Sequence, residues 1–142
     1  MKTSVPKILF SLMLGLFICS TLLTEKAAAD GVNNIGVKIM EKEAVGQYLA
    51  DSNGMTLYRF TRDEKNISHC MEGCADNWPP FHIDPAAAVE GCESGDFAAI
   101  TREDGREQTT YKGIPLYQFI NDKYPGDIFG QGIGGVWFIV TP

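Results

Sequence analysis

The sequence lacks the motifs by which many enzymes hold and transform their substrates. It contains no Gly-x-Ser-x-Gly elbow, no His-Glu-x-x-His helix, no phosphate-binding loop and no dinucleotide fingerprint. The Cys-x-x-Cys-His motif that attaches haem covalently is also absent. Because no complete catalytic motif can be found, the sequence predicts a protein that is not an enzyme.

Long hydrophobic runs are also scarce, and the one that exists lies near the N-terminus. Lys2 and Lys7 precede or flank the start of an apolar run at residues 8–23, and the small residues Ala27–Ala29 follow it. This order is typical of an export signal, with cleavage expected before Asp30. The run is shorter than the roughly 20 residues that cross a bilayer. No second run follows, so no transmembrane span is predicted in the processed chain.

Basic side chains are few after the predicted cleavage. Residues 30–142 carry 9 Lys and Arg against 17 Asp and Glu, a net charge of −8 with histidine neutral. Nucleic acids and anionic membranes are bound mainly through Lys and Arg, so this balance argues against both as partners. The length fits one domain with a modest core.

An internal repeat organises this domain. Residues 54–63 and 113–122 share Gly, Leu, Tyr, Phe and Asp at a constant offset of 59 residues. Trp78 and Trp137 stand at the same offset. Six matches in register indicate a duplication, so the domain is predicted to consist of two related halves.

The residue pattern predicts mostly short strands. Turn signals such as Asp51–Gly54 and Asp104–Gly105 recur about every 10 to 15 residues, as in small sandwiches and barrels. Residues 55–61 carry large side chains on both faces and are predicted to form a central strand, with 114–120 as its second copy. The other predicted strands are residues 37–40, 45–50, 81–83, 97–102, 106–112 and 136–140. The predicted fold is mainly β, a small sandwich or barrel-like sheet.

One short helix is predicted over Cys70–Trp78. Ser68 is its candidate N-cap, and Glu72 falls near its first turn. Pro79 and Pro80 end it, because a proline pushes the residue before it out of helical geometry.

The repeat carries a recognisable pattern, Tyr-x-Phe-x-x-Asp, at Tyr58–Asp63 and again at Tyr117–Asp122. Four further stretches accompany it: Asp51–Tyr58, Cys70–Pro80, Tyr111–Tyr117 and Pro125–Trp137. Over nearly all of residues 45–140, these motifs together resemble the bacterial secreted-repeat family, predicted lipoproteins named for a Tyr-x-aromatic-x-x-Asp motif. The resemblance implies an exported domain in the periplasm, outside the cell or at its surface, where an envelope protein is a candidate partner. The family has no characterised activity, so the resemblance supplies none.

The export signal and the internal repeat together suggest how the chain is divided. We expect a signal peptide at 1–29, a lead-in at 30–44 and one secreted-repeat domain at 45–142, with copies at about 45–83 and 104–142. The chain departs from the family pattern at two points. Ile18 precedes Cys19 where a lipidation signal has a small residue, and Cys92 is additional.

The repeated aromatic and acidic residues allow two interpretations. Aromatic side chains that alternate along strands form cores, where each contributes roughly 1.5–3 kcal/mol when buried. They could instead line a cleft between the halves that binds a flat ligand or a sugar. The aspartates are predicted to fix turns by accepting backbone N–H groups, with paired catalytic carboxylates as the alternative. The candidate ligand-binding residues are Tyr58, Phe60, Asp63, Trp78, Tyr117, Phe119, Asp122 and Trp137.

Three cysteines follow the predicted cleavage site, Cys70, Cys74 and Cys92. In an oxidising compartment two of them are expected to pair and one to stay free. Cys70 and Cys74 share a face if their segment is helical, and Cys92 could reach either one, so the sequence leaves the pairing open.

The alternative use of the same cysteines is a metal or redox site. His69, Cys70 and Cys74, with Met71 or His82 nearby, are soft ligands of the kind that hold copper. This pattern motivates a second hypothesis, a periplasmic copper-binding or electron-transfer protein.

Overall fold

The computed structural model describes residues 35–84 and 88–142. The predicted signal peptide at 1–29, and Cys19 with it, lie outside the described residues. Within the described ranges, no helix combines the length and the hydropathy that crossing a bilayer requires.

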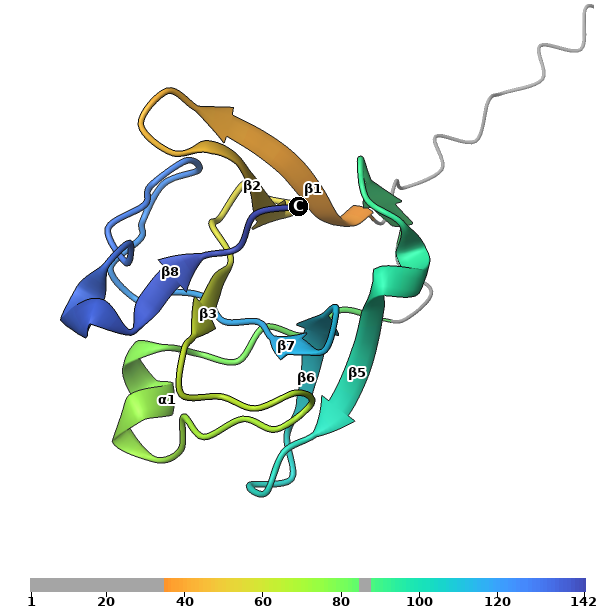
Figure 1. The fold of residues 1–142 in the computed structure, drawn as a ribbon, viewed down its shortest axis with the longest axis vertical. Coiled ribbons are helices and arrows are strands. Elements are labelled where there is room, and N and C mark those ends of the chain that lie inside the picture. Colours follow the sequence, from red (N-terminus) through yellow and green to blue (C-terminus); the bar gives the residue numbers. More distant parts are fainter. Residues whose placement is uncertain (1–34, 85–87) are drawn as a thin grey trace, which may run out of the picture. The chain divides into compact units, whose positions relative to one another are not determined.

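The described chain is mainly β, and its strands form three small sheets with two related halves (Figure 1). The strands are β1 (Ile35–Lys42), β2 (Gly46–Asp51), β3 (Tyr58–Phe60), β4 (Ala88–Glu90), β5 (Phe97–Thr101), β6 (Glu107–Tyr111), β7 (Ile114–Pro115) and β8 (Trp137–Ile139). The sheet orders are β2-β1-β4, β3-β8 and β5-β6-β7. All pairs are antiparallel except β1 with β4, which is parallel. The mainly β prediction is confirmed.

The two repeats form equivalent structures. The β1–β2 hairpin and the β5–β6 hairpin hold similar positions in them, and Figure 1 shows β3 and β7 between these hairpins. The carbonyl of Leu57 accepts the N–H of Val140 at 3.0 Å, and the carbonyl of Leu116 accepts that of Phe81 at 2.9 Å. These four residues are related by the same offset of 59. The duplication therefore extends to the backbone hydrogen bonds that join the sheets.

The two predicted central strands are shorter than expected. Residues 55–61 give only Tyr58–Phe60, and residues 114–120 give only Ile114–Pro115. The cause is an exchange of partners along the chain, since the N–H of Leu57 bonds to Leu49 while that of Tyr58 bonds to Tyr117. Successive residues pair with different segments, so no long ladder forms.

The predicted helix is also shorter and begins later. α1 spans Gly73–Asn77, and its N-cap residue is Glu72, with φ of 47° and no capping side chain. The assignment of Ser68 as N-cap is therefore wrong. The Ser68 hydroxyl is buried and lies 2.7 Å from the Tyr117 hydroxyl. Two short 3-10 turns, η1 (Ser94–Asp96) and η2 (Ile133–Gly135), complete the elements.

Strand alternation divides the core into two clusters. Leu57 and Leu116 pack in one cluster, while their neighbours Tyr58 and Tyr117 pack in the other. All four side chains are fully buried. Because side chains of a strand alternate between its faces, these two segments carry core on both sides. This confirms that they are central in the domain.

Candidate functional site

Four aromatic rings stack at the boundary between the repeats. Phe60 stacks on Trp137 with 4.4 Å between ring centroids, Trp137 on Trp78 at 3.8 Å, and Trp78 on Phe119 at 4.2 Å. The two tryptophan planes differ by only 3°. Phe60 and Trp78 belong to the first repeat, and the other two rings belong to the second. This four-ring stack therefore interleaves the repeats.

The tyrosines and aspartates of the repeat cross between the halves. The Tyr58 hydroxyl donates to Asp122 Oδ2 at 2.6 Å, and the Tyr117 hydroxyl donates to Asp63 Oδ2 at 2.7 Å. The two tyrosines also exchange backbone hydrogen bonds, at 2.8 and 2.9 Å. In these crossed Tyr–Asp pairs, each half uses the carboxylate of the other.

The second oxygen of each aspartate fixes a turn. Asp63 Oδ1 accepts the backbone N–H of His69 at 2.7 Å, and Asp122 Oδ1 accepts that of Phe129 at 2.9 Å. The turn-fixing role predicted for both aspartates is confirmed. Both oxygens of each carboxylate are therefore held by neighbouring protein groups.

A close approach at Gly130 lets the second repeat cover this site. Its backbone N–H lies 3.2 Å from the Tyr58 hydroxyl oxygen, to which it donates. A Cβ at this position would lie 2.7 Å from two carbons of the Tyr58 ring and 2.8 Å from Trp78. No side chain fits there, which explains a glycine beside the rings.

Burial governs the ionisation of the crossed pairs. Desolvation raises the pKa of Asp63 and of Asp122, and in each case it outweighs the lowering by hydrogen bonds from the tyrosine and a backbone N–H. Desolvation is also the main cause of the raised pKa values of Tyr58 and Tyr117. Both hydroxyls therefore keep their protons and serve as donors at physiological pH.

Because the pKa values of Asp63 and Asp122 are raised on folding, the free energy of unfolding is expected to change with pH in a definite direction. A carboxyl that holds its proton more tightly in the folded chain contributes stability that is present below its unfolded pKa and is lost as the pH rises through its folded pKa. The double variant Asp63→Asn/Asp122→Asn cannot titrate at these sites. We therefore expect wild type to lose stability relative to this variant as the pH rises from about 3.5 to 7.

Urea unfolding of wild type and the double variant across that pH range measures the difference. Asp104, whose pKa is lowered mainly by Arg106 and Arg102, is present in both proteins, so its opposite pH dependence cancels in the comparison. A relative gain of wild-type stability with rising pH would contradict the raised pKa values.

The structure brings together all eight residues that the sequence singled out for the repeat interface. Both tyrosines are fully buried, and Trp78 and Trp137 are 5% and 4% exposed. The assignment of these eight residues to ligand binding stays a prediction, because a structural role in the core already accounts for their positions. The equal spacing of tyrosine and aspartate in both copies was the signal that singled these residues out, but it did not predict that they pair across the halves.

Comparison with known protein families identifies the duplication. A family described as a secreted repeat of unknown function matches the chain twice, at residues 40–82 and 98–141. The chain belongs to this family. No curated protein matches the chain. No solved structure matches it either.

In this secreted-repeat chain, Cys70 and Cys74 form a disulfide, with 5.3 Å between their Cα atoms. Cys92 is free and half-buried. Burial raises the pKa of its thiol, so it carries less thiolate than an exposed cysteine. The pairing that the sequence left open is thus settled in favour of the two closest cysteines.

The disulfide predicts a specific thiol count. After denaturation without reductant, the processed secreted-repeat chain is expected to bind one equivalent of an alkylating reagent, at Cys92, as peptide mass spectrometry would show. The double variant Cys70→Ala/Cys74→Ala should lose about 2 kcal/mol of unfolding free energy, the chain-entropy value for a five-residue loop. Cys92→Ala is the control and should keep the disulfide. Three alkylated cysteines would contradict the assignment.

The same disulfide removes the thiolates that the copper hypothesis requires. With their sulfurs bonded to each other, Cys70 and Cys74 cannot ligate a metal as thiolates. His69 Nε2 lies 3.2 Å from Glu64 Oε1 at an exposed position. In residues 35–84 and 88–142, no three His, Cys, Asp or Glu side chains are grouped as a metal site would need.

Sequence reasoning missed the most connected side chain of the secreted-repeat domain, Arg102. Its guanidinium donates to Ser68 Oγ at 2.5 Å, to Gln108 Oε1 at 2.7 Å and to the carbonyl of Cys70 at 2.5 Å. It also contacts the Asp104 carboxylate at 3.1 Å. Arg102 follows a strand and precedes a turn, where arginines are usually exposed, so its burial could not be expected from the residue pattern.

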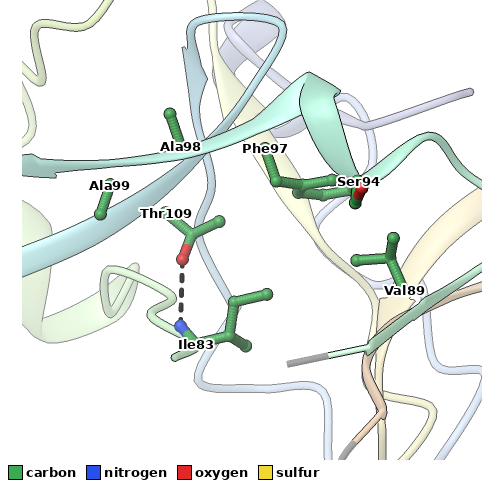
Figure 2. Close-up of a pocket in the computed structure, with 7 residues that line it drawn as sticks. All are labelled: Ile83, Val89, Ser94, Phe97, Ala98, Ala99 and Thr109. Carbon is green, nitrogen blue, oxygen red and sulfur yellow. Dashed lines mark hydrogen bonds between the residues drawn. The ribbon is translucent and has the colours of Figure 1, made fainter. Parts of the chain in front are cut away.

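A small pocket lies beside the second core cluster, between β4, η1 and the β5–β6 hairpin (Figure 2). Its lining is mainly aliphatic and aromatic, with two hydroxyl side chains, Ser94 and Thr109. Figure 2 shows the Thr109 hydroxyl accepting the backbone N–H of Ile83, at 3.0 Å. None of the seven lining residues is an acid, a base or a histidine, so this pocket offers no acid–base chemistry. The lining residues are Ile83, Val89, Ser94, Phe97, Ala98, Ala99 and Thr109.

Proposed function

We propose that this chain is a non-enzymatic module exported to the periplasm or the cell exterior, where it acts by binding. The observation that supports this proposal most directly is that the Tyr and Asp side chains of the repeat motif bond to each other across the two repeats. Tyr58 pairs with Asp122, and Tyr117 pairs with Asp63. Asp63 and Asp122, the candidate catalytic carboxylates, thus form hydrogen bonds that join the two halves.

The state of the aspartates supports this proposal. A catalytic carboxylate has to reach a substrate, either directly or through water. Asp122 is 6% exposed, and both of its oxygens already accept hydrogen bonds from the protein. Asp63 is less buried, but both of its oxygens are held in the same way. A glycosidase-like pair would have to break these bonds before acting.

A combined activity and stability experiment tests the proposal. Purified wild type and the double variant Asp63→Asn/Asp122→Asn are incubated with chromogenic glycosides, esters, phosphate esters and a casein substrate. We expect no turnover by either protein. Turnover by wild type that a folded double variant loses would overturn the proposal, and circular dichroism of the variant establishes that it is folded.

Export is tested separately. The predicted signal peptide at 1–29 should be removed, leaving Asp30 as the first residue of the exported protein. Expression of the full chain in a bacterial host, followed by fractionation and intact mass measurement, reads out both location and processing. Full-length protein retained in the cytoplasm would contradict this part of the proposal.

A further inference from the structure

A groove opens where β3 and the turn before β7 diverge. It is lined by the end of β3, the loop that follows it, the turn at residues 112–113 and β7. Its cationic lining residues are Arg59, Lys65 and Lys112, and its apolar ones include Phe60 and Ile114. We call this the β3 groove. Asp63 also lines it, but both oxygens of that carboxylate are held by the Tyr117 hydroxyl and the His69 N–H.

The β3 groove gathers three cationic side chains beside two carboxylates, within an acidic domain. Three of the nine Lys and Arg residues in 30–142 line it. Within the part of the chain that the structure describes, Arg59 and Lys65 form no ion pair. Lys112 Nζ lies 3.8 Å from Asp96 Oδ2 and over the ring of Tyr111, 4.7 Å from its centroid, but its side chain stays 52% exposed, so solvent weakens both attractions.

Two carboxylates also line the groove, Asp63 and Glu64, but among the described residues neither forms an ion pair with its lysines or Arg59. Asp63 is held by the Tyr117 hydroxyl and the His69 N–H. Glu64 Oε1 lies 3.2 Å from His69 Nε2. Lys65, which has no ion pair among the described residues, is therefore available to an outside anion, and Lys112 can turn from its weak contact with Asp96 to the same anion.

Lys65 and Lys112 flank the same turn. A Cβ on Gly113 would lie 2.7 Å from Cγ of Lys65, so the Lys65 side chain rests directly on this turn. Lys112 precedes Gly113 and has φ of 51°, a backbone conformation that glycine and asparagine adopt more readily than lysine. The fold therefore holds Lys112 in a backbone conformation that costs free energy at this turn.

The other repeat serves as an internal comparison. At the offset of 59, Lys65 corresponds to Tyr124, Lys112 to Asn53 and Arg59 to Gln118. The Gln118 amide donates to Asp51 at 2.8 Å, so this neutral residue is used within the fold. The same architecture therefore forms without the three cations, which means that the fold does not require them.

We propose that the β3 groove binds a small organic carboxylate with an apolar body. Lys65 and Lys112 would supply charge-assisted hydrogen bonds to the carboxylate, Arg59 would add to the positive potential, and Phe60 and Ile114 would contact the apolar part. This inference rests on the proposed function, since it names the ligand class of a module that binds rather than transforms. The groove is open and shallow, which limits affinity to weak binding.

Titration followed by amide chemical shifts tests the groove directly. Benzoate is the probe, with acetate as the version that lacks the apolar body and benzamide as the version that lacks the charge. We expect benzoate to shift the amides of residues 59–65 and 112–115 with a millimolar dissociation constant, and to leave the equivalent residues 118–124 and 53–56 unshifted. Acetate and benzamide should each bind about tenfold more weakly.

The variant Lys112→Asn separates binding from folding. It introduces the residue of the first repeat and removes the lysine from its unfavourable backbone conformation. We expect benzoate affinity to fall about tenfold while the unfolding midpoint stays unchanged or rises. Lys65→Gln should also weaken binding about tenfold, and Lys123→Gln, at an exposed cation outside the groove, should leave it unchanged.

Two results would overturn the inference. One is the absence of groove shifts up to about 10 mM benzoate. The other is unaltered benzoate affinity in the combined Lys65→Gln/Lys112→Asn variant. Either result leaves the non-enzymatic proposal standing, whereas turnover that depends on Asp63 and Asp122 overturns that proposal and leaves the groove untouched.

Discussion

Trp78→Ala is expected to lower the free energy of unfolding by about 3–5 kcal/mol, the usual cost of truncating a buried tryptophan. Trp78 stacks between Trp137 and Phe119 and meets the edge of Tyr58, with centroids 5.4 Å apart. Its removal leaves a cavity at the point where the repeats interleave.

The duplication supplies a matched variant for this prediction. Trp137 stacks on Phe60 and Trp78 and meets the edge of Tyr117, at 5.1 Å, so Trp137→Ala should cost a similar amount. Tyr124→Ala is the control, since Tyr124 is 73% exposed and should change stability by less than about 0.5 kcal/mol. Urea denaturation measures all three. A loss below about 1 kcal/mol for both tryptophans would show that the stack does not join the repeats.

Arg102→Met is expected to cost about 3–5 kcal/mol, because it breaks a buried charged network by removing one partner. Arg102 is 4% exposed, and its guanidinium holds Ser68, Gln108 and the carbonyl of Cys70. Methionine fills much of the volume but satisfies none of these groups. The substitution should destabilise the disulfide segment, whose Cys70 carbonyl loses its donor. It should also destabilise the crossed pair of Tyr117, whose hydroxyl contacts Ser68.

Arg106→Met is the matched control. Arg106 shares the Asp104 carboxylate with Arg102, at 2.7 Å, but its side chain is half exposed. Exposed ion pairs contribute about 0–1 kcal/mol, so this variant should remain close to wild type in urea denaturation. Equal losses in both variants would mean that the shared contact with Asp104, and not the buried network, determines the stability.

The repeat was predictable because the same residue types occur twice in the sequence at a constant spacing. Gly, Leu, Tyr, Phe, Asp and Trp recur at one offset, so alignment of the chain with itself reveals two halves, and alternation of Leu57 with Tyr58 indicates a segment buried on both faces. The crossing of the pairs was not predictable in this way. Tyr58 and Asp63 are close in sequence, and only the antiparallel contact of Tyr58 with Tyr117 sends each hydroxyl to the other half.

The remaining errors concern residues whose partners are distant in sequence. Ser68 precedes a helix-like stretch, as an N-cap does, but its hydroxyl is bonded by Arg102, 34 residues away. The disulfide could not be chosen from the sequence either, since Cys92 was within reach of both partners. The β3 groove was not predictable from the sequence, because Lys65 and Lys112 are far apart in the chain and come close only at the turn that contains Gly113.

The crossed Tyr–Asp pairs and the interleaved rings have a consequence for how such domains assemble. Nothing in the contacts of Tyr58 with Asp122 requires that both residues belong to one polypeptide. A single repeat presents a self-complementary surface, because its tyrosine can pair with the aspartate of a second copy and its aspartate with the tyrosine of that copy. Two such copies would be related by a two-fold axis. The secreted-repeat domain therefore has the internal symmetry of a homodimer whose subunits have been fused, and exchange of halves between neighbouring chains would preserve every one of these contacts.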